Sequence, residues 1–148
     1  MRYDTTKHEA ALCLSHIQHP GRFAVEITPT TGRAIRVASR LRAHVDAQLA
    51  SAFLMGLAAL KKQGVTQGSR VLVSSDVFRF VDTIRTNNLE RFALPLPLRE
   101  RLREDLQEFA FTFEHNSQPI FHIALSNWLY KLPLGILDDL QGLIEQPI

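Results

Sequence analysis

The sequence contains a single cysteine, Cys13, and no apolar run as long as a membrane-spanning helix needs. One cysteine excludes an internal disulfide and any zinc module built on several cysteines, and it is typical of a reducing compartment. The first nine residues are polar and lack the hydrophobic stretch of a signal peptide. We therefore expect a cytoplasmic protein that has no contact with a membrane.

Three common nucleotide-binding and metal-binding signatures are also absent. The sequence has no Gly-Lys-Ser/Thr phosphate loop, no Gly-x-Gly-x-x-Gly turn and no His-Glu-x-x-His pair. Proline and glycine number seven each, are scattered at places typical of turns, and form no linker or repeat. The 148 residues, 45% of them hydrophobic and 22% charged, therefore predict one domain over residues 1–148 with a core of its own.

The charge of the chain is small in sum but uneven along its length. Residues 1–75 contain ten Lys and Arg against four Asp and Glu, whereas residues 76–148 contain seven against eleven. Four arginines, whose planar side chains suit phosphate groups, lie in one stretch: Arg33, Arg36, Arg40 and Arg42. We expect this stretch to form a nucleic-acid-binding surface. The alternative is that its side chains only solvate an exposed strand and the start of a helix.

The first half of the chain predicts strands followed by a long helix. The apolar run Ala10–Ser15 suits either a strand or part of a helix. Alternating apolar residues over 23–27 and 35–37, with turn residues over 29–32 between them, predict a β-hairpin. Residues 42–63 then change to a helical period, and both faces of this segment are apolar. We expect a central helix that is buried between the sheet and another layer.

The second half adds helices and further strands. Residues 70–75 predict a buried strand, Asp76 is a candidate cap for the next helix, and residues 111–114 predict another strand. The chain from residue 120 onward is mostly helical in pattern, and we expect a C-terminal apolar helical extension over about residues 128–148. Its last face is apolar: Ile136, Leu137, Leu140, Leu143 and Ile144. We expect this face to form an interface with a second copy of the chain or with another protein.

The order of these elements resembles the ribonuclease H-like fold, in its shorter version without the basic protrusion. The match concerns order and spacing over about residues 10–130, and it is carried by four segments: the Thr31-Gly32 turn, the helix 50–64, the run 71–76 and the segment 113–116. The resemblance implies an α/β fold with a mixed sheet of about five strands. It also implies a long buried central helix with further helices packed around it.

The resemblance further implies a hydrolytic site of about four carboxylates that hold two Mg²⁺ ions. Asp76 falls at the position that ends the fourth strand. The first-strand position falls near Ser15, or at Asp4 if that strand lies nearer the N-terminus. Asp46 lies about a turn too early for the helix position, and Asn127 stands in place of the last carboxylate. We therefore expect a degenerate, non-catalytic relative without a metal site. The alternative, an active Mg²⁺-dependent nuclease, requires these aspartates and Asn127 to converge.

A zinc site is a weaker hypothesis. Cys13, His16 and His19 would share one face and could ligate zinc if this segment were helical, but they lack a fourth ligand. If the segment is a strand, the shared face is lost. A thiol catalyst is also disfavoured, because Cys13 lies in an apolar run and buried thiols are inert.

Three functions remain as hypotheses. We favour a nucleic-acid-binding module with a ribonuclease H-like fold that uses the Arg33–Arg42 stretch and lacks hydrolytic chemistry. The first alternative is a protein-interaction or assembly subunit that uses the fold as a scaffold, and the second is an active nuclease. The module predicts binding that weakens steeply with salt, and the subunit predicts association that is insensitive to salt. The nuclease predicts Mg²⁺-dependent cleavage that is lost in Asp76→Asn.

Overall fold

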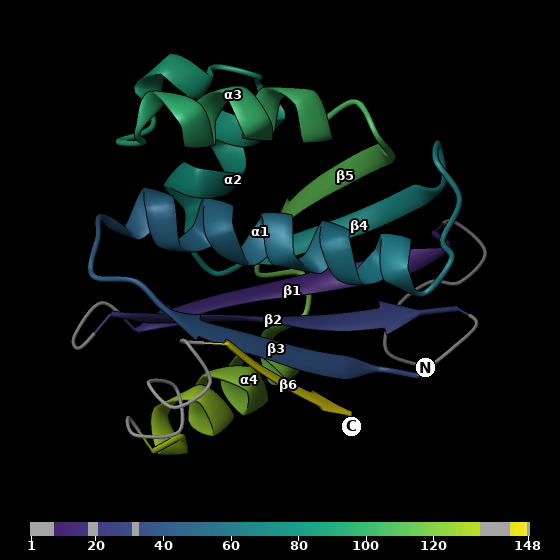
Figure 1. Ribbon diagram of the computed structural model, residues 1–148, viewed down its shortest axis with the longest axis vertical. Helices are drawn as coiled ribbons and strands as arrows, with labels where there is room; N and C mark the ends of the chain where they lie inside the picture. The colour runs from purple at the N-terminus through teal and green to yellow at the C-terminus, as the bar shows by residue number, and fades with distance from the viewer. Residues whose placement is uncertain (1–7, 18–20, 31–32, 134–142, 148) are drawn as a thin grey trace.

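A computed structural model describes residues 8–17, 21–30, 33–133 and 143–147 of the chain (Figure 1). The described strands are β1 (Ala10–Ile17), β2 (Arg22–Pro29), β3 (Ile35–Arg40), β4 (Arg70–Ser75), β5 (Ala110–His115) and β6 (Leu143–Pro147). The described helices are α1 (Val45–Lys62), α2 (Phe78–Arg85), the 3-10 helix η1 (Leu89–Arg91), α3 (Leu96–Asp105) and α4 (Pro119–Lys131). None of these helices combines the length and the apolar character that crossing a bilayer requires.

The strands form one mixed sheet in the order β5-β4-β1-β2-β3-β6. The first three strands are an antiparallel meander, which confirms the predicted hairpin as β2 and β3, and β6 adds antiparallel to β3. β4 runs parallel to β1, and β5 runs parallel to β4, because the long segments that precede these strands contain helical crossovers. The predicted α/β fold class, with a mixed sheet and a long buried central helix, is confirmed, and its element order is consistent with the ribonuclease H-like fold.

Helix α1 lies across one face of the sheet, and α3 packs on its outer side (Figure 1). The helix is therefore buried from two directions, as its apolar faces predict. Gly56 allows its close approach to the sheet, because a Cβ atom at this position would lie 3.0 Å from Leu12 Cδ1 and 3.1 Å from Val25 Cγ2. Close packing of this kind leaves no room for a larger side chain.

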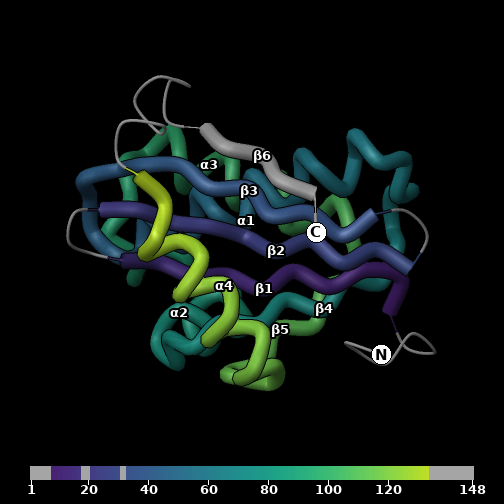
Figure 2. The backbone as a smooth tube through the Cα atoms, turned by 90° about the horizontal axis from the view of Figure 1, so that it is seen from below, coloured from purple at the N-terminus to yellow at the C-terminus, as the bar shows by residue number. Residues whose placement is uncertain are grey.

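Helix α4 covers the opposite face of the sheet, over β1 and β2 (Figure 2). The strands present small side chains there, and these meet Leu125 and Leu129 of the helix: Cys13, Ala24 and Ala38. Because the strand side chains are short, the helix backbone lies close to the sheet.

A buried arginine from β2 binds the carbonyl oxygens at the C-terminal end of helix α4. Arg22 is only 6% exposed, and its Nη1 donates to the carbonyl oxygens of Leu129 at 2.9 Å, Tyr130 at 3.3 Å and Leu132 at 2.6 Å. The last carbonyls of a helix have no partner within the helix, and a cation near them is favourable. The sequence pattern does not reveal this role, because the carbonyls belong to residues more than a hundred positions away.

Two predictions about segments near the ends of the chain are wrong. Residues Ala10–Ile17 form a strand, so the helical alternative for this segment is wrong. The predicted helical extension over about 128–148 is also wrong for Leu143–Pro147, which form β6, and α4 ends at Lys131. Residues 134–142, with Ile136, Leu137 and Leu140 of the predicted apolar face, lie outside the described residues. The spacing of Leu143 and Ile144 does not distinguish helix from strand, and pairing with the distant β3 decides for the strand.

Replacement of Gly56 by valine should lower the free energy of unfolding by about 2–3 kcal/mol, because the new methyl groups push α1 away from β1 and β2. Urea unfolding followed by tryptophan fluorescence measures the loss. The matched control is Ala58→Val, since Ala58 is exposed on the same helix and should cost only about 0.5 kcal/mol in helix propensity. Equal losses in the two variants would show that the approach of α1 to the sheet is not close.

Candidate functional site

A crevice opens at the carboxyl ends of β4 and β5, where the chain leaves the sheet in opposite directions. After β4 the chain passes to α2 on the α1 side of the sheet, and after β5 it passes to α4 on the other side (Figure 1). Sheets with parallel strands bind ligands at such points. The crevice has a volume of about 350 Å³. Pro119 and Ile123 line it together with five polar residues: Asp76, Asn116, His122, Ser126 and Asn127.

Two of the predicted site residues, Asp76 and Asn127, line this one crevice. The prediction that Asp76 caps the next helix is wrong. Val77 is the N-cap of α2, and its N–H donates to Ser75 Oγ at 3.1 Å. The Asp76 carboxylate is exposed and forms no hydrogen bond or ion pair with the residues that the structure describes. It is the one acidic group that lines the crevice.

Two hydrogen bonds between neutral side chains join α4 to the sheet beside the crevice. Ser15 near the end of β1 shares a hydrogen bond with Ser126 of α4, with 2.7 Å between their Oγ atoms. Ser74 of β4 bonds through Oγ to His122 Nε2 at 2.8 Å. Ser15 stands where the resemblance implies a carboxylate. These hydroxyl and imidazole groups therefore hold α4 in place on β1 and β4.

The crevice does not fit two Mg²⁺ ions. Such a pair needs several carboxylate oxygens, and the crevice supplies one carboxylate. Within the described ranges, no group of three His, Cys, Asp or Glu side chains could hold a metal ion. The crevice thus lacks the negative charge that would dehydrate two hard cations.

Asp46 is bonded within the fold and does not line the crevice. Its side chain is 1% exposed and accepts hydrogen bonds from Arg79 Nη1 at 2.7 Å and from the Ala93 N–H at 2.8 Å. These contacts tie the start of α1 to α2 and to the segment after η1. The crevice therefore does not bring Asp46 together with Asp76, as the alternative nuclease hypothesis requires, and Asp4 lies outside the described residues.

The zinc hypothesis fails because the segment is a strand. Residues three apart on a strand point to opposite faces, so Cys13 and His16 cannot converge. Cys13 packs under α4, and burial raises the pKa of its thiol, which keeps it protonated and unreactive. His19 lies outside the described residues.

Arg36, at the centre of the predicted nucleic-acid surface, is held within the fold. Its Nε atom lies 3.1 Å from Glu26 Oε1, and its guanidinium carbon lies 5.6 Å from the centroid of the Trp128 ring on α4. Only 20% of the Arg36 side chain stays exposed. This arginine therefore links β3, β2 and α4.

The other arginines of the stretch are spread along β3. Arg33 and Arg42 are exposed, and Arg40 is half-buried. Because Arg33 precedes β3 and Arg42 follows it, the two exposed residues stand up to about 30 Å apart along an extended chain. The stretch thus does not present its four cations as one exposed patch.

The outward face of α4 carries large apolar side chains where a surface helix normally carries charge. Ile120, Ile123 and Tyr130 are 76%, 63% and 74% exposed. From Pro119 to Tyr130 the helix contains no Asp, Glu, Lys or Arg. Sequence reasoning missed this face because both sides of the helix are apolar, so a helical period could not separate the inner face from the outer one.

The chain matches no protein-family model, and no curated protein matches its sequence. The function must therefore be inferred from the geometry of the chain itself.

Removal of the Asp46 carboxylate should destabilise the protein, and removal of the Asp76 carboxylate should not. Asp46→Ala leaves Arg79 and the Ala93 N–H without their acceptor and should cost about 2–3 kcal/mol of unfolding free energy. Asp76→Ala removes an exposed group and should stay within about 0.5 kcal/mol of the parent. Thermal and urea unfolding of both variants measure this, and a large loss in Asp76→Ala would place Asp76 in the packing of the fold.

Stability should fall in mild acid because of His122. Burial lowers the pKa of His122 from its usual value near 6.5 in the folded protein. The unfolded chain then takes up a proton first, so stability is full above about pH 6.5 and falls as the pH drops toward the folded pKa. Urea unfolding at several pH values between about 7.5 and 5 measures the slope. His122→Gln keeps a polar group for Ser74 but cannot titrate, so its slope should be shallower, and equal slopes would exclude His122 as the cause.

Proposed function

We propose that this chain is a non-catalytic ribonuclease H-like domain that works as an assembly subunit, with α4 of one copy packed against α4 of a second copy. The observation that carries the proposal is the exposed apolar face of α4, formed by Ile120, Ile123 and Tyr130. Burial of this face between two copies gains roughly 25 cal/mol for each Å² of apolar surface removed from water.

The exposed side chains of α3 differ from those of α4, and the difference supports a protein partner on the face of α4. Both helices lie on the outside of the sheet layers. Beyond its first turn, where Leu96 is exposed, the exposed side chains of α3 are charged: Glu100, Arg101, Arg103 and Glu104. Apolar side chains gathered on one helix face, with no charge among them, are typical of a surface that a protein partner covers.

The spacing of the exposed residues favours a second copy as the partner. Four of the exposed residues of α4, namely Ile120, Ile123, Asn127 and Tyr130, are separated by three, four and three positions, so this stripe is symmetric about its midpoint, and the exposed Ala124 lies beside it. A two-fold axis through that midpoint makes the helices antiparallel. It sets Ile120 against Tyr130 of the partner subunit and Ile123 against Asn127 of the partner subunit. Self-complementarity of this kind is what a two-fold interface requires.

The order of the sheet and its connections supports the ribonuclease H-like part of the proposal. The antiparallel meander precedes two parallel strands, and α1 and α4 cover opposite faces. The non-catalytic part rests on the crevice, where Asp76 is the one carboxylate. The nucleic-acid module has less support than the assembly subunit, because Arg36 is held by Glu26 and the exposed Arg33 and Arg42 stand at opposite ends of β3.

The dimer should be weak and insensitive to salt. Helix α4 has 13 residues and spans about 20 Å, so one helix pair buries an interface at the low end of the specific range. Sedimentation velocity of the full chain between about 5 and 500 µM should show a monomer–dimer equilibrium. The equilibrium should change little between about 0.05 and 0.5 M NaCl, because the face is uncharged.

A charge in the middle of the stripe should disrupt the dimer. Ile123→Glu should raise the dissociation constant at least about tenfold, since two carboxylates would be buried near the two-fold axis. The matched control is Leu96→Glu, because Leu96 is 61% exposed on α3, away from α4. A chain that stays monomeric at every concentration, or a dimer weakened equally by both variants, would contradict the proposal.

The same preparations distinguish the other two functions. Labelled single-stranded, duplex and RNA–DNA hybrid oligonucleotides are titrated at low and high salt, with and without Mg²⁺. Salt-sensitive binding that Arg33→Ala and Arg42→Ala weaken together would favour the nucleic-acid module. Mg²⁺-dependent cleavage that Asp76→Asn abolishes would favour the nuclease.

A further inference from the structure

Among the described residues, β5 is the outermost strand on its side of the sheet. The N–H groups of Ala110 and Asn116 donate to carbonyl oxygens on the β4 side at 2.9 and 2.8 Å. Backbone groups alternate along a parallel strand, so those of Phe111, Phe113 and His115 point away from β4. No strand in the described part of the chain pairs with this edge. The edge therefore offers alternating donors and acceptors to an added strand.

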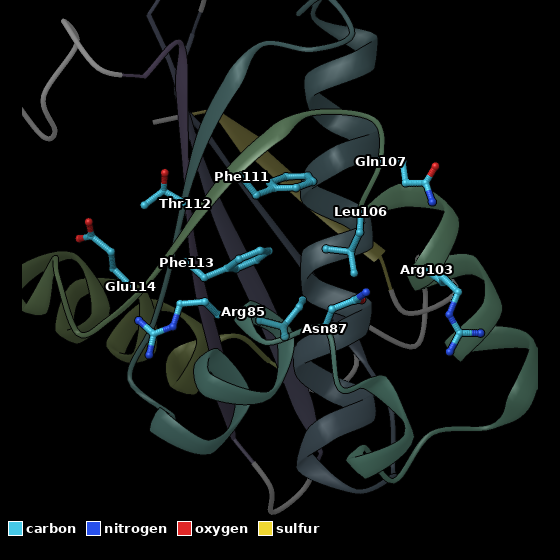
Figure 3. A pocket seen from close by; sticks show the side chains of 10 residues that line it. Arg85, Asn87, Arg103, Leu106, Gln107, Phe111, Thr112, Phe113 and Glu114 are labelled. Carbon is cyan, nitrogen blue, oxygen red and sulfur yellow. The ribbon is translucent and has the colours of Figure 1, made fainter.

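A groove runs beside this edge, between β5, α2 and α3 (Figure 3). Its volume is about 650 Å³. Phe111 and Phe113 project from β5 toward α1, where both rings pack on Phe53, and they line one side of the groove with 5.5 Å between their ring centroids. Leu106, the C-cap of α3, faces them (Figure 3). The side chains of Thr112 and Glu114 lie on the other face of the strand (Figure 3). The groove thus has an apolar wall on the same face of β5 as the α1 core.

Two arginines stand on the rim of the groove. Arg85 of α2 and Arg103 of α3 both line it, and 52% and 47% of their side chains are exposed. Each has an acidic neighbour, at 3.6 Å in Asp82 and at 2.8 Å in Glu90. A guanidinium has five N–H donors, so each arginine can bind a second carboxylate from a ligand.

We propose that the β5 edge and this groove bind an extended acidic peptide segment of a partner protein as an additional strand. The peptide backbone pairs with the outward groups of Phe111, Phe113 and His115. One large apolar side chain enters the groove beside Leu106. A carboxylate two residues along the peptide lies on the same face, about 7 Å away, and bonds to Arg85 or Arg103. Backbone pairing supplies affinity in such complexes, and pockets for alternate side chains supply specificity.

The N–H donors that Arg85 and Arg103 keep beside their ion pairs favour a foreign peptide that carries a carboxylate over a second copy of this chain. If β5 of a second copy were added here, its groove-facing side chains would be the partner's Phe111, the partner's Phe113 and the partner's His115, and none of them is a carboxylate. A nucleic acid cannot continue a β-ladder. The proposed site is also independent of the α4 interface, because α4 packs over β1 and β2 on the other face of the sheet.

The test uses the full chain and two designed peptides with a fluorescent label. The first, Ser-Val-Thr-Phe-Gln-Glu-Thr-Val, places Phe and Glu on one face of a strand. The second, Ser-Val-Thr-Gln-Phe-Glu-Thr-Val, has the same composition but places Phe and Glu on opposite faces. Fluorescence anisotropy should give the first peptide a dissociation constant below about 1 mM and at least about tenfold tighter binding than the second.

Two further measurements locate the binding. Arg85→Glu combined with Arg103→Glu should weaken the first peptide at least about tenfold, and the matched control Arg101→Glu should not, since Arg101 is 65% exposed on α3 and does not line the groove. Amide hydrogen exchange should slow at Phe111, Phe113 and His115 when the first peptide binds. Absence of binding at about 1 mM, equal binding of the two peptides, or unchanged exchange at these amides would overturn the proposal. These outcomes do not depend on whether α4 forms a dimer.

Discussion

The docking of α4 on the sheet determines the rest of the arrangement. Near its start the helix is held by the hydrogen bond of His122 to Ser74, and at its end by Arg22, which binds the last carbonyl oxygens. Between these points Ser126 bonds to Ser15. All of these polar groups form hydrogen bonds between the helix and the sheet. The outer side is left with apolar residues and no charge, and this makes it a candidate interface.

The same docking explains the chemistry of the crevice. A two-metal site crowds carboxylates together, and their repulsion is tolerated only because metal ions neutralise it. Here Ser15 bonds to Ser126 and Ser74 bonds to His122, so these neutral groups are joined in pairs without an ion. Asp46 is also neutralised, by Arg79. Polar groups that serve helix docking and packing are not available for catalysis, and the exposed Asp76 is left alone.

The two proposed surfaces lie on different parts of the sheet. The face of α4 is apolar and self-complementary, whereas the groove beside β5 combines an apolar wall with two arginines and an open strand edge. One suits a copy of the same chain, and the other suits an extended acidic segment. The α4 face shares Ile123 and Asn127 with the lining of the crevice at Asp76, whereas the groove beside β5 shares no residue with it. A chain of this kind can join two partners with the fold as a rigid scaffold.

Local patterns in the sequence determined the elements whose signals are periodic, namely the hairpin β2–β3, the long helix α1 and strand β4. The pattern over residues 111–114 likewise predicted β5. Tertiary structure decided the segments whose local pattern suits either a helix or a strand. Pairing with β2 and β4 makes residues 10–17 a strand, and pairing with β3 does the same for Leu143–Pro147. Asp46 and Asp76 both precede or begin helices, yet only the fold brings Arg79 and the Ala93 N–H to Asp46. Periodicity depends on neighbouring residues, whereas strand pairing and the neutralisation of a charge depend on residues that are distant in the sequence.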